Sequence, residues 1–222
     1  MTNGRTNDYQ LSPTPFSVKW RISWLRRKTV SILLAFANEK NVGEINLKIH
    51  QFVTGHDNEG NAVFLADAEV SPVEVTMIPG YKTYELWSTQ GDRSVPHEGP
   101  FPGVPGYFPA RDGTVFRMIV LPPSQEGSTA VEVSEAGLDE ISQKLPGFVE
   151  HLELDNPGMH TTDSVDYGIV ITGEVYLELD NGEERLLTAG DCVVQNGTRH
   201  AWRNRSGKPV TMAFVLLGAH KR

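Results

Sequence analysis

The sequence predicts an all-β fold, a sandwich or barrel of short strands accompanied by one short helix. Short runs of apolar residues are separated by turn residues at intervals of roughly eight to twelve residues, and only one segment has helical spacing. The chain has 222 residues, of which 39% are hydrophobic and 22% charged. These values are ordinary for one globular domain with an appended arm, and such a chain can bury a core.

The N-terminal part of this pattern predicts a hairpin. Apolar and polar residues alternate from Ile45 to Ile49, a turn is expected over residues 55–61, and an apolar run returns at 62–65. A further strand is expected over residues 81–88. These strands precede the region in which the strand pattern is strongest.

The rest of the chain supplies the loop, the helix and the remaining strands. Residues 92–112 are rich in Gly and Pro and lack periodicity, which predicts an ordered loop on the surface. A strand is expected over 114–121, ended by two prolines, and a helix over 134–145 with Ser134 as its cap. Asp180-Asn181-Gly182 is a strong sequence for a tight hairpin turn.

The charge balance favours a small-molecule partner. The chain carries 20 Lys and Arg residues against 28 Asp and Glu residues, a formal net charge of −8. A nucleic acid or an anionic membrane requires a positive surface, so neither is expected as a partner. The single cysteine, Cys192, can form no internal disulfide, and its apolar neighbours predict a small buried hydrophobic residue.

The N-terminus allows two interpretations. A basic cluster over residues 26–28 precedes the apolar run 30–37, which ends in a pattern similar to a signal-peptidase site. If residues 20–37 act as a signal peptide, the protein is exported. If they are a start-site extension or an arm, it is cytoplasmic. No apolar run reaches the ~18 residues of a membrane span.

We expect three parts in the chain. Residues 1–40 form a leader or flexible arm, residues 41–112 contain the N-terminal strands and the loop rich in Pro and Gly, and residues 113–222 form the barrel. No internal repeat indicates a second barrel.

The first of two motifs contains His160, Asp166 and Gly173 at fixed spacing. Side chains on a strand alternate between its faces, so His160, Thr162 and Asp166 share a face and can point into one cavity. The second motif contains Gly190, which is separated by six residues from Gly197.

The second motif continues with His200 three residues after Gly197 and Asn204 four residues later. Gly197 can take the backbone conformation that a tight turn before His200 requires. Together, the two motifs resemble the paired motifs of the cupin superfamily, small single-domain proteins with an RmlC-like jelly roll. The resemblance covers about the last hundred residues. In it, Thr162 stands where the family has a second histidine, and Asp166 where it has glutamate.

The resemblance implies a double-stranded β-helix, the cupin jelly-roll barrel, with a metal or a small polar ligand at its mouth. His160, Asp166 and His200 would be the metal ligands. Two histidines and one carboxylate leave open coordination positions and suit Fe, and also Mn, Ni or Zn. In the alternative interpretation, the two histidines are hydrogen-bonded pocket residues without a metal.

Apolar residues are expected to line the pocket wall, and Tyr167 and Trp202 are expected to point away from the cavity into packing. The expected lining residues are Phe116, Met118, Met212, Phe214 and Leu216.

The function expected from this resemblance is that of a metal-dependent enzyme on a small oxygenated or aromatic metabolite, of dioxygenase, decarboxylase, isomerase or dehydratase type. The alternative is a metal-free cupin that binds a small molecule without catalysis. A homodimer is expected, because a single jelly roll leaves sheet edges exposed and the N-terminal strands have no place in a minimal barrel.

Overall fold

A computed structural model describes residues 47–91, 93–95, 103–124, 134–153 and 155–221. The predicted leader over residues 1–40, with its candidate signal segment 20–37, lies outside the described residues.

The predicted N-terminal hairpin is confirmed. Strand β1 (Ile49–His56) pairs antiparallel with β2 (Ala62–Val70), with a β-bulge after Val53. The turn between them is held by Asp57, whose Oδ1 accepts hydrogen bonds from two backbone N–H groups at 2.9 Å. The hairpin begins at Ile49, so the alternation seen from Ile45 onward starts earlier than the strand.

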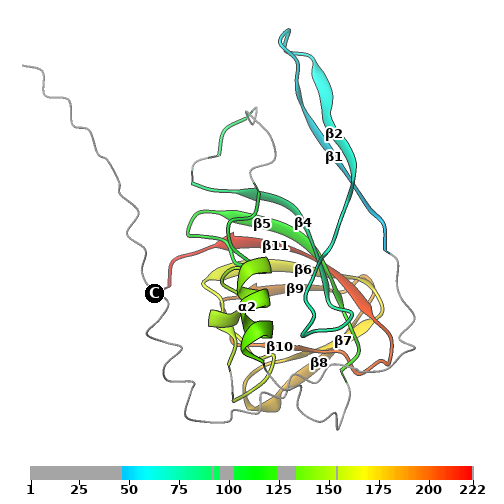
Figure 1. The fold of residues 1–222 in the computed structure, drawn as a ribbon, viewed down its shortest axis with the longest axis vertical. Coiled ribbons are helices and arrows are strands. Elements are labelled where there is room, and N and C mark those ends of the chain that lie inside the picture. The colour runs from blue at the N-terminus through cyan, green and yellow to red at the C-terminus, as the bar shows by residue number, and fades with distance from the viewer. Residues whose placement is uncertain (1–46, 92, 96–102, 125–133, 154, 222) are drawn as a thin grey trace, which may run out of the picture. The chain divides into compact units, whose positions relative to one another are not determined.

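The largest sheet has six strands in the order β3-β4-β5-β11-β6-β9, and the pairs are antiparallel (Figure 1). Two of these strands were expected from the sequence, β4 within one residue and β5 with the predicted bounds. The strands are β3 (Val73–Glu74), β4 (Lys82–Thr89), β5 (Thr114–Leu121), β11 (Val210–Gly218), β6 (Ser164–Thr172) and β9 (Cys192–Asn196).

A second sheet has three strands in the order β10-β7-β8, namely β10 (Ala201–Arg203), β7 (Glu174–Glu178) and β8 (Glu184–Thr188). The predicted tight turn joins β7 to β8 as the short 3-10 element η2 (Asp180–Gly182). Asn181 has φ 60° and Gly182 φ 73°, so both positions of the turn take the left-handed conformation that this residue pair favours.

The predicted helix is also confirmed as α2 (Glu135–Lys144). The Ser134 side chain accepts a hydrogen bond from the Gly137 N–H at 3.0 Å and so caps the helix. Ile141 and Leu145 are buried in the main core. A 3-10 element, η1 (Val149–His151), follows the helix.

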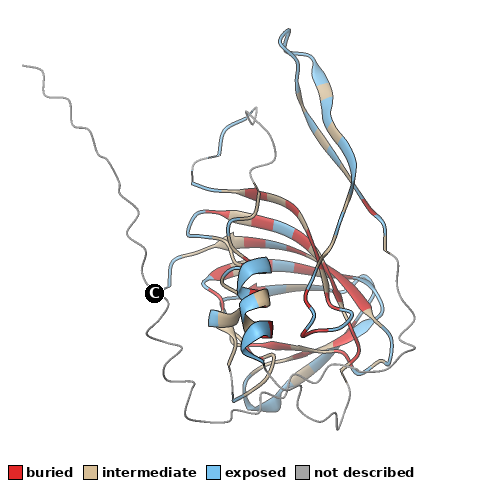
Figure 2. Ribbon diagram, in the orientation of Figure 1, coloured by how far each residue is buried: buried red, intermediate tan, exposed pale blue. Residues whose placement is uncertain are grey.

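The core of this jelly roll draws apolar residues from both sheets and from α2, and Figure 2 shows the buried positions along the strands. Three of the expected lining residues, all on β11, belong to it: Met212, Phe214 and Leu216. Their alternation along one strand gives the sheet a single inward face there.

The expectation for β5 is wrong, because the strand faces the other way. Arg117 points inward and is 2% exposed, whereas Phe116 is 41% exposed on the outer face. Met118 shares that outer face and packs in a second cluster with Ile49. Residues 114–121 are apolar at nearly every position, so hydrophobic alternation could not identify the inward face.

The expectations for Cys192, for Tyr167 and for the division of the chain at residue 113 have different outcomes. Cys192 is exposed, so its predicted burial is wrong. Tyr167 does point away from the interior, but into solvent, since it is 51% exposed. The division at residue 113 stays a prediction, although β3 and β4, which precede it, belong to the same sheet as β5.

Among the described residues, no helix combines the length and the apolar character needed to cross a membrane.

A clasp around Asn204 joins the end of β5 to the loop before β11. The buried Asn204 Nδ2 donates to the carbonyls of Leu121 at 2.9 Å and Lys208 at 2.7 Å. Its Oδ1 accepts from the N–H and hydroxyl of Ser206 at 3.1 and 2.8 Å. One side chain thus pairs four backbone or side-chain groups near the end of the second motif.

Replacing Asn204 with alanine should lower the free energy of unfolding by about 2–3 kcal/mol, because it leaves buried groups without partners. The exposed Asn196 provides a matched control. Asn196→Ala should change the stability by no more than about 0.5 kcal/mol. Urea denaturation of both variants measures the difference, and equal stabilities would contradict the role of the clasp.

Candidate functional site

His160 and His200 lie side by side and hold each other through their backbones. The N–H of each donates to the carbonyl of the other, at 2.9 and 3.0 Å. Their ring centroids are 4.2 Å apart and the ring planes are inclined by 52°. The structure therefore brings together the two histidines that the motif spacing predicted.

Both rings are anchored by the same nitrogen. Nδ1 of His160 contacts the carbonyl of Gly158 at 3.0 Å, and Nδ1 of His200 contacts the carbonyl of Thr198 at 2.9 Å. A carbonyl can only accept a hydrogen bond, so Nδ1 must carry the proton in each ring. In the neutral imidazole the lone pair is then on Nε2.

The anchor of His160 is fixed by the turn before it. Gly158 has φ 82°, a conformation that glycine adopts without strain. Arg203 donates to the Pro157 carbonyl at 2.6 Å and is paired with Glu178 at 2.5 Å. The residue before Gly158 is thus held by an arginine of β10 that is ion-paired with β7, which fixes the turn but does not contact the Gly158 carbonyl itself.

The anchor of His200 is held similarly. Gly197 has φ 64°, as the sequence predicted for this turn. Arg199 binds both carboxylate oxygens of Glu153, at 2.7 and 2.5 Å, and also Asp180 at 2.8 Å. Its hydrogen bonds lower the pKa of Glu153. The Gly197 turn on one side of Thr198 and the ion pairs of Arg199 on the other therefore flank the carbonyl that anchors His200.

Burial keeps both imidazoles neutral. Desolvation lowers the pKa of His160, and it lowers the pKa of His200 to about 4, with the neighbouring His160 contributing. At neutral pH both rings therefore present an unprotonated Nε2.

Asp166 points into the interior from β6 and is 5% exposed. Its Oδ1 has no hydrogen-bond partner among the described residues. Burial raises the pKa of this carboxyl. The hydroxyls of Ser164 and Thr162 and the positive charge of Arg117 lower the pKa, but by less than burial raises it. The carboxylate is buried, as a ligand in this position would be.

The described residues contain no group of three or more His, Cys, Asp or Glu side chains that could hold a metal ion. The two histidines fit a transition metal, since both are neutral and have a free lone pair. Asp166 does not form one group with them. The three-ligand set of His160, Asp166 and His200 therefore stays a prediction, with two of its members in place.

Arg117 contributes a buried positive charge that the sequence analysis did not anticipate. Its guanidinium pairs with Glu85 of β4 at 3.3 Å and lies over the ring of Tyr107, 3.8 Å from the centroid. It also donates to the Tyr107 carbonyl. These contacts tie the described part of the loop rich in Gly and Pro to the inner face of β5.

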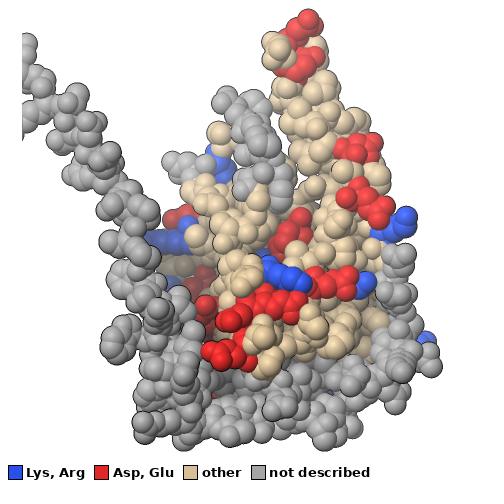
Figure 3. Space-filling view, viewed as in Figure 1, with Lys and Arg blue, Asp and Glu red and all other residues tan. Residues whose placement is uncertain are grey.

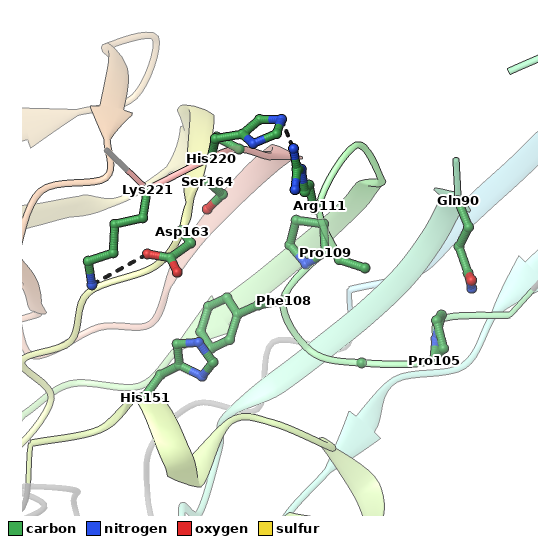
Figure 4. A pocket seen from close by; sticks show the side chains of 13 residues that line it. Gln90, Pro105, Phe108, Pro109, Arg111, His151, Asp163, Ser164, His220 and Lys221 are labelled. Carbon is green, nitrogen blue, oxygen red and sulfur yellow. Dashed lines mark hydrogen bonds and ion pairs between the residues drawn. The ribbon is translucent and has the colours of Figure 1, made fainter. Parts of the chain in front are cut away.

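A pocket of about 680 Å³ opens beside Phe108 and His151 (Figure 4). Five separate segments form it: the residue after β4, the loop before β5, η1, the start of β6 and the C-terminal residues. Its lining consists of Gln90, Pro105, Gly106, Phe108, Pro109, Ala110, Arg111, His151, Asp163, Ser164, Ala219, His220 and Lys221.

Phe108 connects this pocket to the histidines. Its ring centroid lies 4.4 Å from that of His151 and 6.3 Å from that of His160. Ser164, another lining residue, donates its hydroxyl to Thr162 at 2.9 Å. A ligand in the pocket would thus be separated from the His160 ring by one aromatic side chain.

Several residues in and near this pocket were not predicted from the sequence. They are His151, His220, Phe108 and Ser164 of the pocket, and Arg117 of β5. None belongs to a motif with fixed spacing, because the pocket is assembled from segments far apart in the chain. The charge of Arg117 within an otherwise apolar strand was the one available signal.

Comparison with known proteins supports the motif assignment. Residues 153–216 match the Cupin domain family. "Phomopsin biosynthesis cluster protein C'" of Diaporthe leptostromiformis is 60% identical over 62 residues, which are 28% of this chain and 33% of that protein. The chain thus spans about a third of the length of this relative.

A longer match exists with "Cupin-domain-containing oxidoreductase fogC" of Aspergillus ruber. It is 30% identical over 181 residues, 77% of this chain and 72% of that protein. A solved structure, a cupin 2 conserved barrel domain protein from Salinispora arenicola, is 18% identical, with a TM-score of 0.34 over 68% of this chain and 90% of that one. The chain belongs to the cupin-domain family.

Proposed function

We propose that the protein is a cupin-type oxidoreductase that acts on a small molecule at the His160–His200 pair. The observation that carries this proposal is the presence of two adjacent imidazoles, His200 buried and His160 half-buried, whose Nδ1 atoms are both held by backbone carbonyls. Two lone pairs without a donor between them favour a cation or a proton-donating ligand at that position. The adjoining pocket has a volume typical of small-molecule sites.

The names of the relatives support the class of reaction and its setting. The Aspergillus ruber protein and one from Neurospora crassa, 27% identical over 172 residues, are both named as cupin-domain-containing oxidoreductases. The Diaporthe relative belongs by name to a biosynthesis cluster. We infer that this chain acts on a small biosynthetic metabolite.

A divalent transition metal, Fe, Mn, Ni or Zn, would be held by Nε2 of His160 and His200, with Asp166 as the further ligand predicted from the sequence. When bound, such a metal polarises a carbonyl or carboxylate or activates dioxygen. The protein's own contributions are separate from this chemistry: the backbone pairing orients the rings, their burial keeps them neutral, and Phe108 screens His160 on the side of the pocket.

A metal-free cupin that binds a small molecule without turnover is the second candidate. Asp166 does not form a metal-binding group with the two histidines, which favours this candidate, because only two protein ligands lie together among the described residues. Metal binding distinguishes the two candidates.

We also propose that the protein is a homodimer. Phe52 and Phe64 of the β1–β2 hairpin are 59% and 72% exposed, and Phe116, Tyr167 and Val194 are exposed on the outer face of the six-stranded sheet. Apolar surface of this kind is typical of interaction sites.

Removing either histidine should abolish stoichiometric metal binding. Titration calorimetry of chelator-treated protein with Zn²⁺, and with Fe²⁺ under anaerobic conditions, should give one site per chain in the wild type. His160→Ala and His200→Ala should each lose that site while circular dichroism shows a retained fold. His56→Ala, on the exposed hairpin, is the control and should bind as the wild type does. If the wild type binds no metal, the metal-free candidate is favoured.

The stability contributed by His200 should depend on pH. Its pKa is about 4 in the folded protein and about 6.5 in the unfolded chain. Between these values only the unfolded chain binds the proton, so stability is lost as pH falls from 6.5 towards 4. His200→Gln lacks this proton site, so the difference in free energy of unfolding between wild type and variant should change by roughly 3 kcal/mol over that interval. A constant difference would refute the burial effect.

Light scattering at micromolar concentration should report twice the mass of one chain, 24.6 kDa. Replacing both Phe52 and Phe64 with serine should shift the protein towards the monomer, because the dimer would no longer bury these two apolar side chains. A monomer mass for the wild type would exclude the homodimer.

A further inference from the structure

We propose that the pocket beside Phe108 and His151 binds a small organic acid, with its carboxylate against Arg111 and its flat apolar part against Phe108. This inference rests on the proposed function and names the class of substrate for that site. Figure 4 shows the two side chains on different sides of the pocket, Arg111 next to His220 and Phe108 next to His151.

The basic side of the pocket offers hydrogen-bond donors. Nε of Arg111 donates to Nε2 of His220 at 2.9 Å, so His220 accepts there and its Nδ1 carries a proton. The contacts of Arg111 within the described protein involve Nε, including the one to Asp112 at 3.7 Å. The two terminal NH₂ groups of the guanidinium remain for a ligand, and their geometry matches a carboxylate.

The acidic group of the lining is already paired. Asp163 is the one carboxylate among the described lining residues, and Lys221 lies 3.7 Å from it. The acid nearest to Arg111, Asp112, contacts Nε and lies outside the lining, so a negative ligand at the terminal NH₂ groups meets no unpaired carboxylate of the described lining. Ser164 adds a hydroxyl to the same wall.

The opposite side of the pocket is apolar and flat. Phe108 lies between Pro105 and Pro109 along the loop, and all three line the pocket. The Phe108 ring also contacts the ring of His151, which limits its movement. The Phe108 ring favours a planar group, and a volume of about 680 Å³ accommodates a ligand of one or two rings.

Local charge must account for any binding of an acid, because the whole chain is negative. The formal net charge is −8, and Figure 3 shows acidic side chains along the β1–β2 hairpin and around α2. Such a field disfavours anions at long range. Lys221 lies against Asp163, so Arg111 supplies the local positive charge, with His220 beside it.

The position of the acid group also orients the ligand. A carboxylate at Arg111 directs the rest of the molecule along the pocket towards Phe108, the residue whose ring centroid is 6.3 Å from that of His160. The reacting part of the substrate would therefore be the end remote from the acid.

Benzoate and its neutral isostere benzamide are suitable probes, measured by titration calorimetry on the full chain at low and high salt. The wild type should bind benzoate at least tenfold more tightly than benzamide, and added salt should weaken only benzoate. Arg111→Gln should reduce benzoate affinity about tenfold and leave benzamide unchanged. Arg185→Gln, at an exposed arginine paired with Glu183 outside the pocket, should behave as the wild type.

Equal affinity for the two probes, no benzoate binding by the wild type, or the same benzoate affinity in the Arg111 and Arg185 variants would each overturn the proposal. The His200→Ala variant separates it from the proposed function. If the acid site is correct, that variant retains benzoate binding whether or not the histidines hold a metal. If benzoate fails to bind while the histidines bind metal, only the substrate class is wrong.

Discussion

The reciprocal backbone pairing of His160 and His200 is the constraint on which the site depends. Two hydrogen bonds, of 2.9 and 3.0 Å, bring residues 40 positions apart into register, and the ring contact follows from that register. Each ring then finds a carbonyl two residues earlier in the chain. Burial favours the neutral ring and outweighs the hydrogen bond to the carbonyl, which alone would raise the pKa of His200, and the anchor places the lone pair of the neutral ring on Nε2.

The parts of this arrangement that local sequence determines were predictable. The Asn181-Gly182 turn, the Ser134 cap and the Gly197 turn each depend on the backbone preferences of one or two residues, and all three occur as expected. The spacing of the two motifs likewise identified both histidines. Such features need no knowledge of distant segments.

The remaining features depend on how distant segments meet. The inward face of β5 could not be inferred, because the strand is apolar on both faces and its outer side packs against the hairpin. The pocket joins residues as far apart as Gln90 and Lys221, and no spacing rule relates them. Asp166 was placed in the interior correctly, but parity along a strand could not determine whether its carboxylate reaches the histidines.

The state of the two rings can be observed directly by nitrogen NMR of protein with ¹⁵N-labelled histidine. At pH 7 the account predicts that His160 and His200, assigned with the alanine variants, are both neutral with the proton on Nδ1. It also predicts that added Zn²⁺ shifts the Nε2 signals of both rings. A proton on Nε2, or a charged ring at that pH, would contradict the central claim that the pair presents two free lone pairs to a ligand.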